Sequence, residues 1–273
     1  MPVERATPER VQELVHNYEE IVNQVQHATE KRGPGPKPRL VVVTKLKPSS
    51  DIQALYEHGI RHFGENYPQE LEGKAKELPE DIAWHYIGTL QSNKCKMLAS
   101  IPNLFAIETL TSAKAANQLQ STLASLPTLR SAPLNVFIQI NTSGEEQKSG
   151  LPALSGSQTG GGEVVDLAAH ILEKCPALRL RGLMTIGSLD SSVSAHPNPD
   201  FERLKETRTA LLAALRARDG LQQAVEQLVR EQEGGLELSM GMSNDFVEAI
   251  EQGSTNVRVG SSIMGARPPR PSS

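Results

Sequence analysis

The first indication of the architecture comes from nine residues, Leu40-Val-Val-Val-Thr-Lys-Leu-Lys-Pro48. Their first half is a continuous apolar run of strand length, which is typical of a parallel strand buried on both faces. Upstream, apolar residues recur at helical spacing from Thr7 to Lys31, and Gly33-Pro-Gly-Pro36 then ends that pattern. We therefore expect a helix, a break and a buried strand.

The same alternation continues along the rest of the chain. Seven further strand-like runs follow, at 60–63, 83–87, 104–107, 134–140, 178–186, 236–239 and 256–259. Helical patterns lie between them, at 51–58, 69–77, 112–126, 164–174, 201–218 and 244–252. Eight strands that alternate with helices predict a parallel sheet closed into a single (β/α)8 TIM barrel, with an extra N-terminal helix. An open doubly wound sheet is the alternative architecture.

Two stretches are too rich in Gly, Pro and Ser to pack. Residues 151–162 predict a flexible insertion between the fifth strand and its helix, and residues 267–273 predict a tail without structure. Neither stretch has the character of a domain boundary. Because TIM barrels need about 250 residues, a chain of 273 suits one barrel, and we expect a single domain over residues 1–273.

Charge and cysteine content restrict the class of protein. A net charge of −4 argues against a general nucleic-acid binder, which would present a basic face. The N-terminal acids Glu4, Glu9 and Glu13 argue against a secretory or transit peptide, and no apolar run reaches the length of a membrane span. Cys95 and Cys175 suit neither a disulfide framework nor a metal site, and Cys95 is expected to be a surface thiol. We expect a soluble, cytoplasmic protein without metal.

The first candidate for chemistry is Lys45, which directly follows the strand at 40–44. In TIM barrels the active site lies at the carboxyl ends of the strands. A lysine desolvated at that rim would have a lowered pKa, and its amine would be nucleophilic toward an aldehyde. The alternative is a solvated lysine at a strand end, and Lys47 is the better candidate for that role.

The segments after the seventh and eighth strands predict an anion site. Ser243 can lie at or beside the start of the helix at 244–252, and Gly260 lets the backbone approach an anion after the last strand. Phosphate sites in TIM barrels often follow these two strands. Asn66 and His85 follow the second and third strands and can reach the same mouth, although such residues also commonly tie down loops.

Several motifs together resemble one family, the pyridoxal phosphate homeostasis proteins, and the details look fungal. The motifs are Val43-Thr-Lys-Leu-Lys-Pro48, Phe63-Gly-Glu-Asn-Tyr67, His85-Tyr-Ile-Gly-Thr-Leu-Gln-Ser-Asn-Lys94, Gln139-Ile-Asn-Thr-Ser143, Lys148-Ser-Gly150, Arg181-Gly-Leu-Met-Thr-Ile186, Leu238-Ser-Met-Gly-Met-Ser243 and Val257-Arg-Val-Gly-Ser261. The resemblance covers about residue 10 to Arg267. It implies a barrel like the N-terminal domain of alanine racemase, without that enzyme's second domain.

The resemblance also implies a cofactor and its contacts. It implies pyridoxal 5′-phosphate held as a Schiff base on Lys45, with the phosphate at Ser243, Gly260 and Ser261 and the pyridine nitrogen facing Arg258. Asn66, His85 and Met240 complete the implied cofactor-binding set. The chain departs from the family at Thr44, Leu46 and Ser261, where Ser, Thr and Thr are commoner. We expect Leu46 to change the pocket rim and to leave the bond to Lys45 intact.

Three functions from different classes are compatible with these residues. A permanently cationic Arg258 disfavours a protonated ring nitrogen, so the bound cofactor would stabilise carbanions weakly. This favours a protein of intracellular cofactor homeostasis that holds pyridoxal 5′-phosphate and has cofactor-dependent apo-enzymes as potential recipients. Because the resemblance does not extend to the second domain of alanine racemase, we expect a monomer. The alternative is an amino-acid racemase that recruits Tyr67, Tyr86 or His85 as its second acid–base group. A barrel that serves only as an interaction scaffold is a third possibility.

Overall fold

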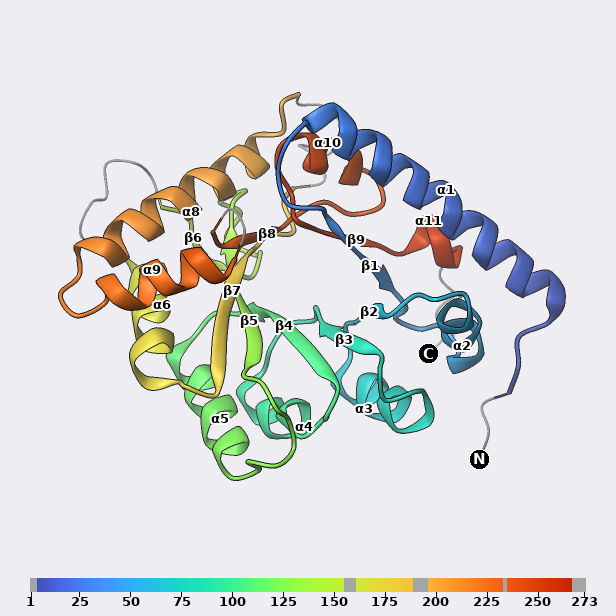
Figure 1. Ribbon diagram of the computed structural model, residues 1–273, viewed down its shortest axis with the longest axis horizontal. Coiled ribbons are helices and arrows are strands. Elements are labelled where there is room, and N and C mark those ends of the chain that lie inside the picture. Colours follow the sequence, from blue (N-terminus) through green and yellow to red (C-terminus); the bar gives the residue numbers. More distant parts are fainter. Residues whose placement is uncertain (1–3, 155–160, 189–195, 233–234, 267–273) are drawn as a thin grey trace.

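The strands close into a ring. The computed structural model describes residues 4–154, 161–188, 196–232 and 235–266. Eight parallel strands pair in the order β1-β2-β3-β4-β5-β7-β8-β9, and β9 pairs again with β1. The pairings of β1 with β9 and of β4 with β5 leave no open edge, so the predicted barrel is confirmed and the open sheet is excluded. Figure 1 shows the helices around this ring.

The strands are short and lie close to their predicted positions. They comprise β1 (Arg39–Val43), β2 (His62–Glu65), β3 (Ala83–Tyr86), β4 (Leu104–Leu110), β5 (Leu134–Asn141), β7 (Leu178–Met184), β8 (Glu237–Ser239) and β9 (Asn256–Val259). A two-residue strand, β6 (Leu151–Pro152), is added to β5. The predicted run at 60–63 is two residues early, because Ile60 and Arg61 lie before β2.

The helices cover the outside of the barrel. The main ones are α1 (Pro8–Arg32), α2 (Ser49–Glu57), α3 (Pro68–Glu77), α5 (Ala113–Ala124), α6 (Glu163–Lys174), α8 (Pro199–Ala217) and α10 (Phe246–Glu251). Four short or amphipathic elements lie outside the helical ranges given from the sequence, namely η1 (Ser92–Lys94), α4 (Cys95–Ala99), α9 (Gln222–Glu231) and α11 (Ser261–Met264). Three of these have at most five residues, too few to show a helical repeat.

The extra N-terminal helix begins and ends as its sequence dictates. The side chain of Thr7 accepts a hydrogen bond from the backbone N–H of Arg10 at 3.2 Å, and Pro8 occupies the first helical position. Gly33 ends the helix with φ 82°. The helix α1 lies along α10, α11 and α2 (Figure 1) and so covers the seam where β1 meets β9.

Two expectations need correction. The predicted insertion at 151–162 starts too early, because Leu151 pairs with β5 and both Leu151 and Leu154 are buried. Residues 155–160 and the predicted tail at 267–273 lie outside the described residues. Cys95 is fully buried rather than a surface thiol, and burial raises its pKa to about 11. It faces inward because the helix α4 packs its apolar side against the core.

Candidate functional site

A pocket of about 390 Å³, called the mouth pocket below, lies at the carboxyl ends of the strands. It is lined by six of the eight predicted binding residues, which are Lys45, Asn66, Ser243, Arg258, Gly260 and Ser261. They come from the segments that follow β1, β2 and β8, from β9 itself and from the segment after it. The barrel therefore brings together residues that lie up to 216 positions apart in the chain.

Lys45 lies in the turn that follows β1. Its side chain is partly buried and lines the pocket. The next residue, Leu46, has φ 61°, the left-handed conformation that residues with a Cβ rarely adopt. Lys47 also lines the pocket, but its Nζ donates to the backbone oxygen of Ala266 at 2.7 Å. Desolvation lowers the pKa of Lys47, and the nearby charge of Arg10 adds to the effect.

The other side of the pocket presents hydroxyl groups and backbone N–H groups. The Oγ of Ser243 accepts a hydrogen bond from the N–H of Gly260 at 3.2 Å, which ties the segment after β8 to the segment after β9. A Cβ at Gly260 would lie 3.3 Å from the Cβ of Val43 and 3.4 Å from its carbonyl oxygen. A side chain there would crowd β1. Ser261 begins α11, whereas Ser243 lies three residues before α10 and not at its first turn.

Arg258 is the buried cation of the site. Only 3% of its surface is exposed, and its Nη2 donates to the backbone oxygen of Thr185 at 2.7 Å. Its Nη1 donates to the Oγ of Ser239 and lies 3.8 Å from Oε2 of Glu108. Burial lowers the pKa of Arg258, but an arginine keeps its charge in proteins. Arg258 therefore presents a fixed positive charge at the base of the pocket.

Asn66 is held at the pocket wall by its neighbour. A Cβ at Gly88 would lie only 1.9 Å from the backbone oxygen of Asn66, so only glycine permits this close approach. Within the described part of the chain, Oδ1 of Asn66 is buried without a hydrogen-bond partner. Asn66 also lines a second cavity of about 270 Å³ beside the first, and the two share Ile87 and Ile186.

The other two predicted binding residues, His85 and Met240, are described but do not line the mouth pocket. His85 lies on β3 inside the barrel and is fully buried, while Met240 is fully buried in the main apolar core. The neighbouring Met242 lines the pocket instead. Met240 and Met242 would face the same side of a regular strand, but β8 ends at Ser239 and Gly241 has φ 94°, so the chain turns between them.

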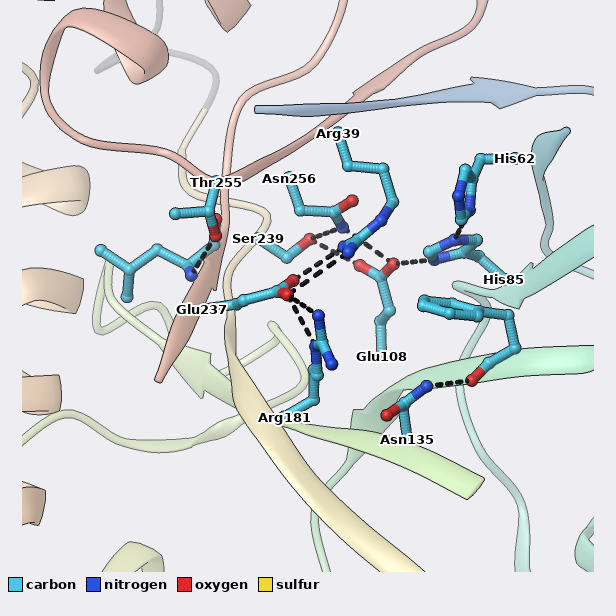
Figure 2. Close-up of polar contacts among 12 residues, drawn as sticks. Arg39, His62, His85, Glu108, Asn135, Arg181, Glu237, Ser239, Thr255 and Asn256 are labelled. Carbon is cyan, nitrogen blue, oxygen red and sulfur yellow. Dashed lines mark hydrogen bonds and ion pairs between the residues drawn. The ribbon is translucent and has the colours of Figure 1, made fainter. Parts of the chain in front are cut away.

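The barrel interior holds a polar network that the sequence did not reveal. The Nδ1 of His85 lies 2.6 Å from Oε1 of Glu108, and its Nε2 lies 3.0 Å from Nδ1 of His62 (Figure 2). Ser239 and Asn256 also donate to the Glu108 carboxylate, at 2.5 and 2.9 Å. The one hint in the sequence was Glu108, an acid that directly follows the apolar run at 104–107, because buried strand positions seldom hold an unpaired carboxylate.

The protonation states follow from the donors and acceptors. Burial lowers the pKa of His85, so its ring is neutral, and its Nδ1–H must donate because a carboxylate only accepts. Its Nε2 then accepts from Nδ1–H of His62, whose pKa burial lowers to about 3. Burial by itself would raise the pKa of Glu108, but the hydrogen bond from His85 and the charge of Arg258 hold it at about 2. Glu108 is thus an ionised counter-charge for Arg258.

A second set of ion pairs lies nearer the amino ends of the strands, where Arg39 begins β1 and Glu237 begins β8. Glu237 accepts from Arg39 at 2.7 Å and from Nε of Arg181 at 2.6 Å (Figure 2).

The described part of the chain contains no group of acidic, histidine or cysteine side chains arranged to hold a metal ion. Nor does any described helix have the length and apolar character needed to cross a membrane. The mouth pocket, with an amine and an anion-binding side, is therefore the principal candidate site.

Comparison with known proteins defines the class first. The family model for the alanine racemase N-terminal domain matches residues 10–268, so the chain belongs to that family. An alanine racemase from Corynebacterium glutamicum has the same fold, with a TM-score of 0.62 at 14% identity over 94% of this chain and 62% of the enzyme. This chain is a barrel of that class.

The particular family is narrower. The chain belongs to the pyridoxal phosphate homeostasis proteins, as the motifs indicated. It is 43% identical to the Schizosaccharomyces pombe protein of that name, over 84% of each chain, and 42% identical to the human one, over 90% of this chain and 84% of that one. The structure of PipY from Synechococcus elongatus with pyridoxal phosphate bound is similar, with a TM-score of 0.62 and 26% identity over 87% of this chain and all of PipY.

Proposed function

We propose that this protein binds pyridoxal 5′-phosphate in the mouth pocket, holds it as a Schiff base on Lys45, and serves intracellular homeostasis of that cofactor. The observation that carries the proposal is the shared pocket of Lys45, Ser243, Arg258, Gly260 and Ser261. Its support from relatives is that PipY is described with pyridoxal phosphate bound and that other relatives are named for its homeostasis. Two free cysteines suit a cytoplasmic location.

The residues present fit the cofactor. The anion side offers the hydroxyls of Ser243 and Ser261, and Gly260 leaves room that a Cβ would fill. The pocket is also lined by Lys45 and by Asn66, whose Oδ1 has no hydrogen-bond partner in the described structure. The pocket volume of about 390 Å³ falls within the range that holds small ligands and cofactors.

Each residue has a definite part in binding. Lys45 would hold the cofactor through its amine, which would condense with the aldehyde group and release water. Hydroxyl and backbone donors near Ser243 and Ser261 hold the phosphate, whose two charges they offset. Arg258 sits at the base, where its fixed charge disfavours a proton on a neighbouring ring nitrogen. When bound, the cofactor supplies electrophilic chemistry, and this chain's residues restrain it.

The arrangement supports a carrier over a racemase. A racemase needs a second proton-transfer group on the far side of the cofactor. Tyr86 is 1% exposed and donates to the backbone oxygen of Thr89, and its pKa is raised to about 12 by burial. His85 lies inside the barrel, and Tyr67, which is 49% exposed, does not line the mouth pocket among the described residues. None of the three candidates faces the site.

The test combines trapping with exchange. Purified protein is incubated with pyridoxal 5′-phosphate, reduced with borohydride and mapped by mass spectrometry, and we expect the adduct on Lys45 and its loss in Lys45→Ala. Lys47→Ala is the matched control and should retain the adduct. An adduct on Lys47, or covalent trapping by Lys45→Ala, would refute the proposal. Incubation with L-alanine in heavy water tests the alternative, since catalytic entry of deuterium at Cα would show a racemase.

A further inference from the structure

A buried ion cluster surrounds the turn that carries Lys45. It consists of Glu65 at the end of β2 and of Glu70 and Lys74 on α3, and is called the turn clamp below. The Nζ of Lys74 lies 2.7 Å from Oε1 of Glu65 and 2.6 Å from Oε1 of Glu70. Lys74 is only 5% exposed and Glu65 is fully buried.

The turn clamp contacts the chain on both sides of Lys45. On one side, Lys74 Nζ donates to the backbone oxygen of Thr44 at 2.9 Å, and the Thr44 hydroxyl donates to Glu65 at 2.6 Å. On the other side, the backbone N–H of Leu46 donates to Oε1 of Glu70 at 2.7 Å. The residues before and after Lys45 are thus fixed by charged groups from two different elements.

This turn needs such restraint because its backbone is strained. Leu46 has φ 61°, and a non-glycine residue in that region persists only when its surroundings determine the conformation. The Glu70 carboxylate supplies the acceptor that the Leu46 N–H meets in this conformation. The strain and its restraint lie directly beside the residue proposed to hold the cofactor, and neither Glu65, Glu70 nor Lys74 lines the mouth pocket among the described residues.

Stability alone does not account for the turn clamp. A buried salt bridge often contributes little to stability, because the desolvation of both charges offsets their attraction. The cluster also leaves Oε2 of Glu65 buried and without a hydrogen-bond partner in the described structure, and burial raises the pKa of Glu65. An apolar cluster of similar volume would avoid both penalties.

We infer that Glu65, Glu70 and Lys74 are positioning residues that fix the turn 44–46 and thereby aim the amine of Lys45 into the mouth pocket. The inference rests on the proposed function, since it concerns how Lys45 reaches the cofactor. It requires that loss of the turn clamp impair formation of the covalent bond more than noncovalent binding, because the anion side of the pocket comes from other elements, near β8 and β9.

The test compares two ligands that differ only at the reacting carbon. Pyridoxal 5′-phosphate reports covalent capture through its visible absorbance, and pyridoxine 5′-phosphate, which has an alcohol in place of the aldehyde, reports noncovalent binding. Glu70→Ala removes the acceptor for Leu46, and we expect capture of the aldehyde to slow by about tenfold. Affinity for the alcohol should change by no more than about twofold.

Three further variants sharpen the result. Glu70→Gln keeps a carbonyl oxygen for the Leu46 N–H and should restore most of the capture rate. Glu72→Ala, on the same helix, breaks only an exposed pair with Lys76 and should match the wild type. Lys74→Met keeps the aliphatic stem and should slow capture at least as much as Glu70→Ala. Since Lys74 is buried, Glu70→Ala decides the outcome if Lys74→Met fails to fold.

The outcomes separate this inference from the proposed function. If Lys45→Ala abolishes capture while Glu70→Ala behaves like Glu72→Ala, the inference is wrong and the proposed function stands. The inference is also wrong if Glu70→Ala weakens binding of the alcohol as much as capture of the aldehyde, since the clamp would then support the whole pocket. If Lys45→Ala still captures the aldehyde, the proposed function itself fails.

Discussion

Replacement of Glu108 by glutamine tests the account of the barrel interior. The carboxylate of Glu108 lies 3.8 Å from Nη1 of Arg258, and both side chains are almost fully buried. At an effective dielectric constant of about 20, two unit charges at that distance attract by ~4 kcal/mol. Removal of one partner leaves the other charge buried and unpaired, which typically costs about 3–5 kcal/mol. We therefore expect Glu108→Gln to lower the free energy of unfolding by about 3 kcal/mol.

The assay is equilibrium unfolding of the cofactor-free protein in urea. The control is Glu202→Gln, which breaks a half-buried pair with Lys205 and should change the free energy of unfolding by less than about 1 kcal/mol. The double variant Glu108→Gln with Arg258→Met should lose less stability than the sum of the two single variants, because it leaves no unpaired charge, whereas each single variant leaves one. A loss for Glu108→Gln no larger than that of the control would refute the description of Glu108 as the counter-charge of Arg258.

Three further predictions concern the pocket, the interior and the thiols. Gly260→Ala brings a Cβ to 3.3 Å from Val43 and should weaken cofactor retention by about tenfold, while Gly73→Ala, where a Cβ meets nothing within 4 Å, should leave retention unchanged in a dialysis assay. Acid should destabilise the fold. The pKa of His62 is lowered from 6.5 to about 3 and that of Glu108 from 4.5 to about 2, so the unfolded chain binds these protons first and stability falls as pH drops from 6.5 toward 3. A free energy of unfolding in urea that stays level across this interval would contradict the neutral state of His62. Cys95 is fully buried with its pKa raised to about 11, so a thiol reagent should react with it only as fast as the chain unfolds, and rapid labelling of the native protein would contradict its burial.

Local sequence patterns predicted the fold and those residues of the candidate site that lie at the ends of strands. The apolar run that ends at Val43 and the one at 256–259 are visible because a buried strand needs several consecutive apolar residues, which is a local property. Strand ends then place Lys45, Ser243 and Gly260 at one mouth, because parallel strands of a barrel all point the same way. The family motifs added Arg258 and Ser261, which their positions alone had not singled out.

The tertiary structure alone decided what faces the barrel interior and what holds the turn. Whether His85 and Glu108 meet depends on the register of β3 against β4, and the contact of Glu108 with Arg258 spans the barrel. Lys74 looks like an ordinary surface lysine of α3 in the sequence, yet its amine is buried beneath the turn of Lys45. Such contacts join residues far apart along the chain, and strand pairing and helix docking set their geometry, so no local pattern encodes them.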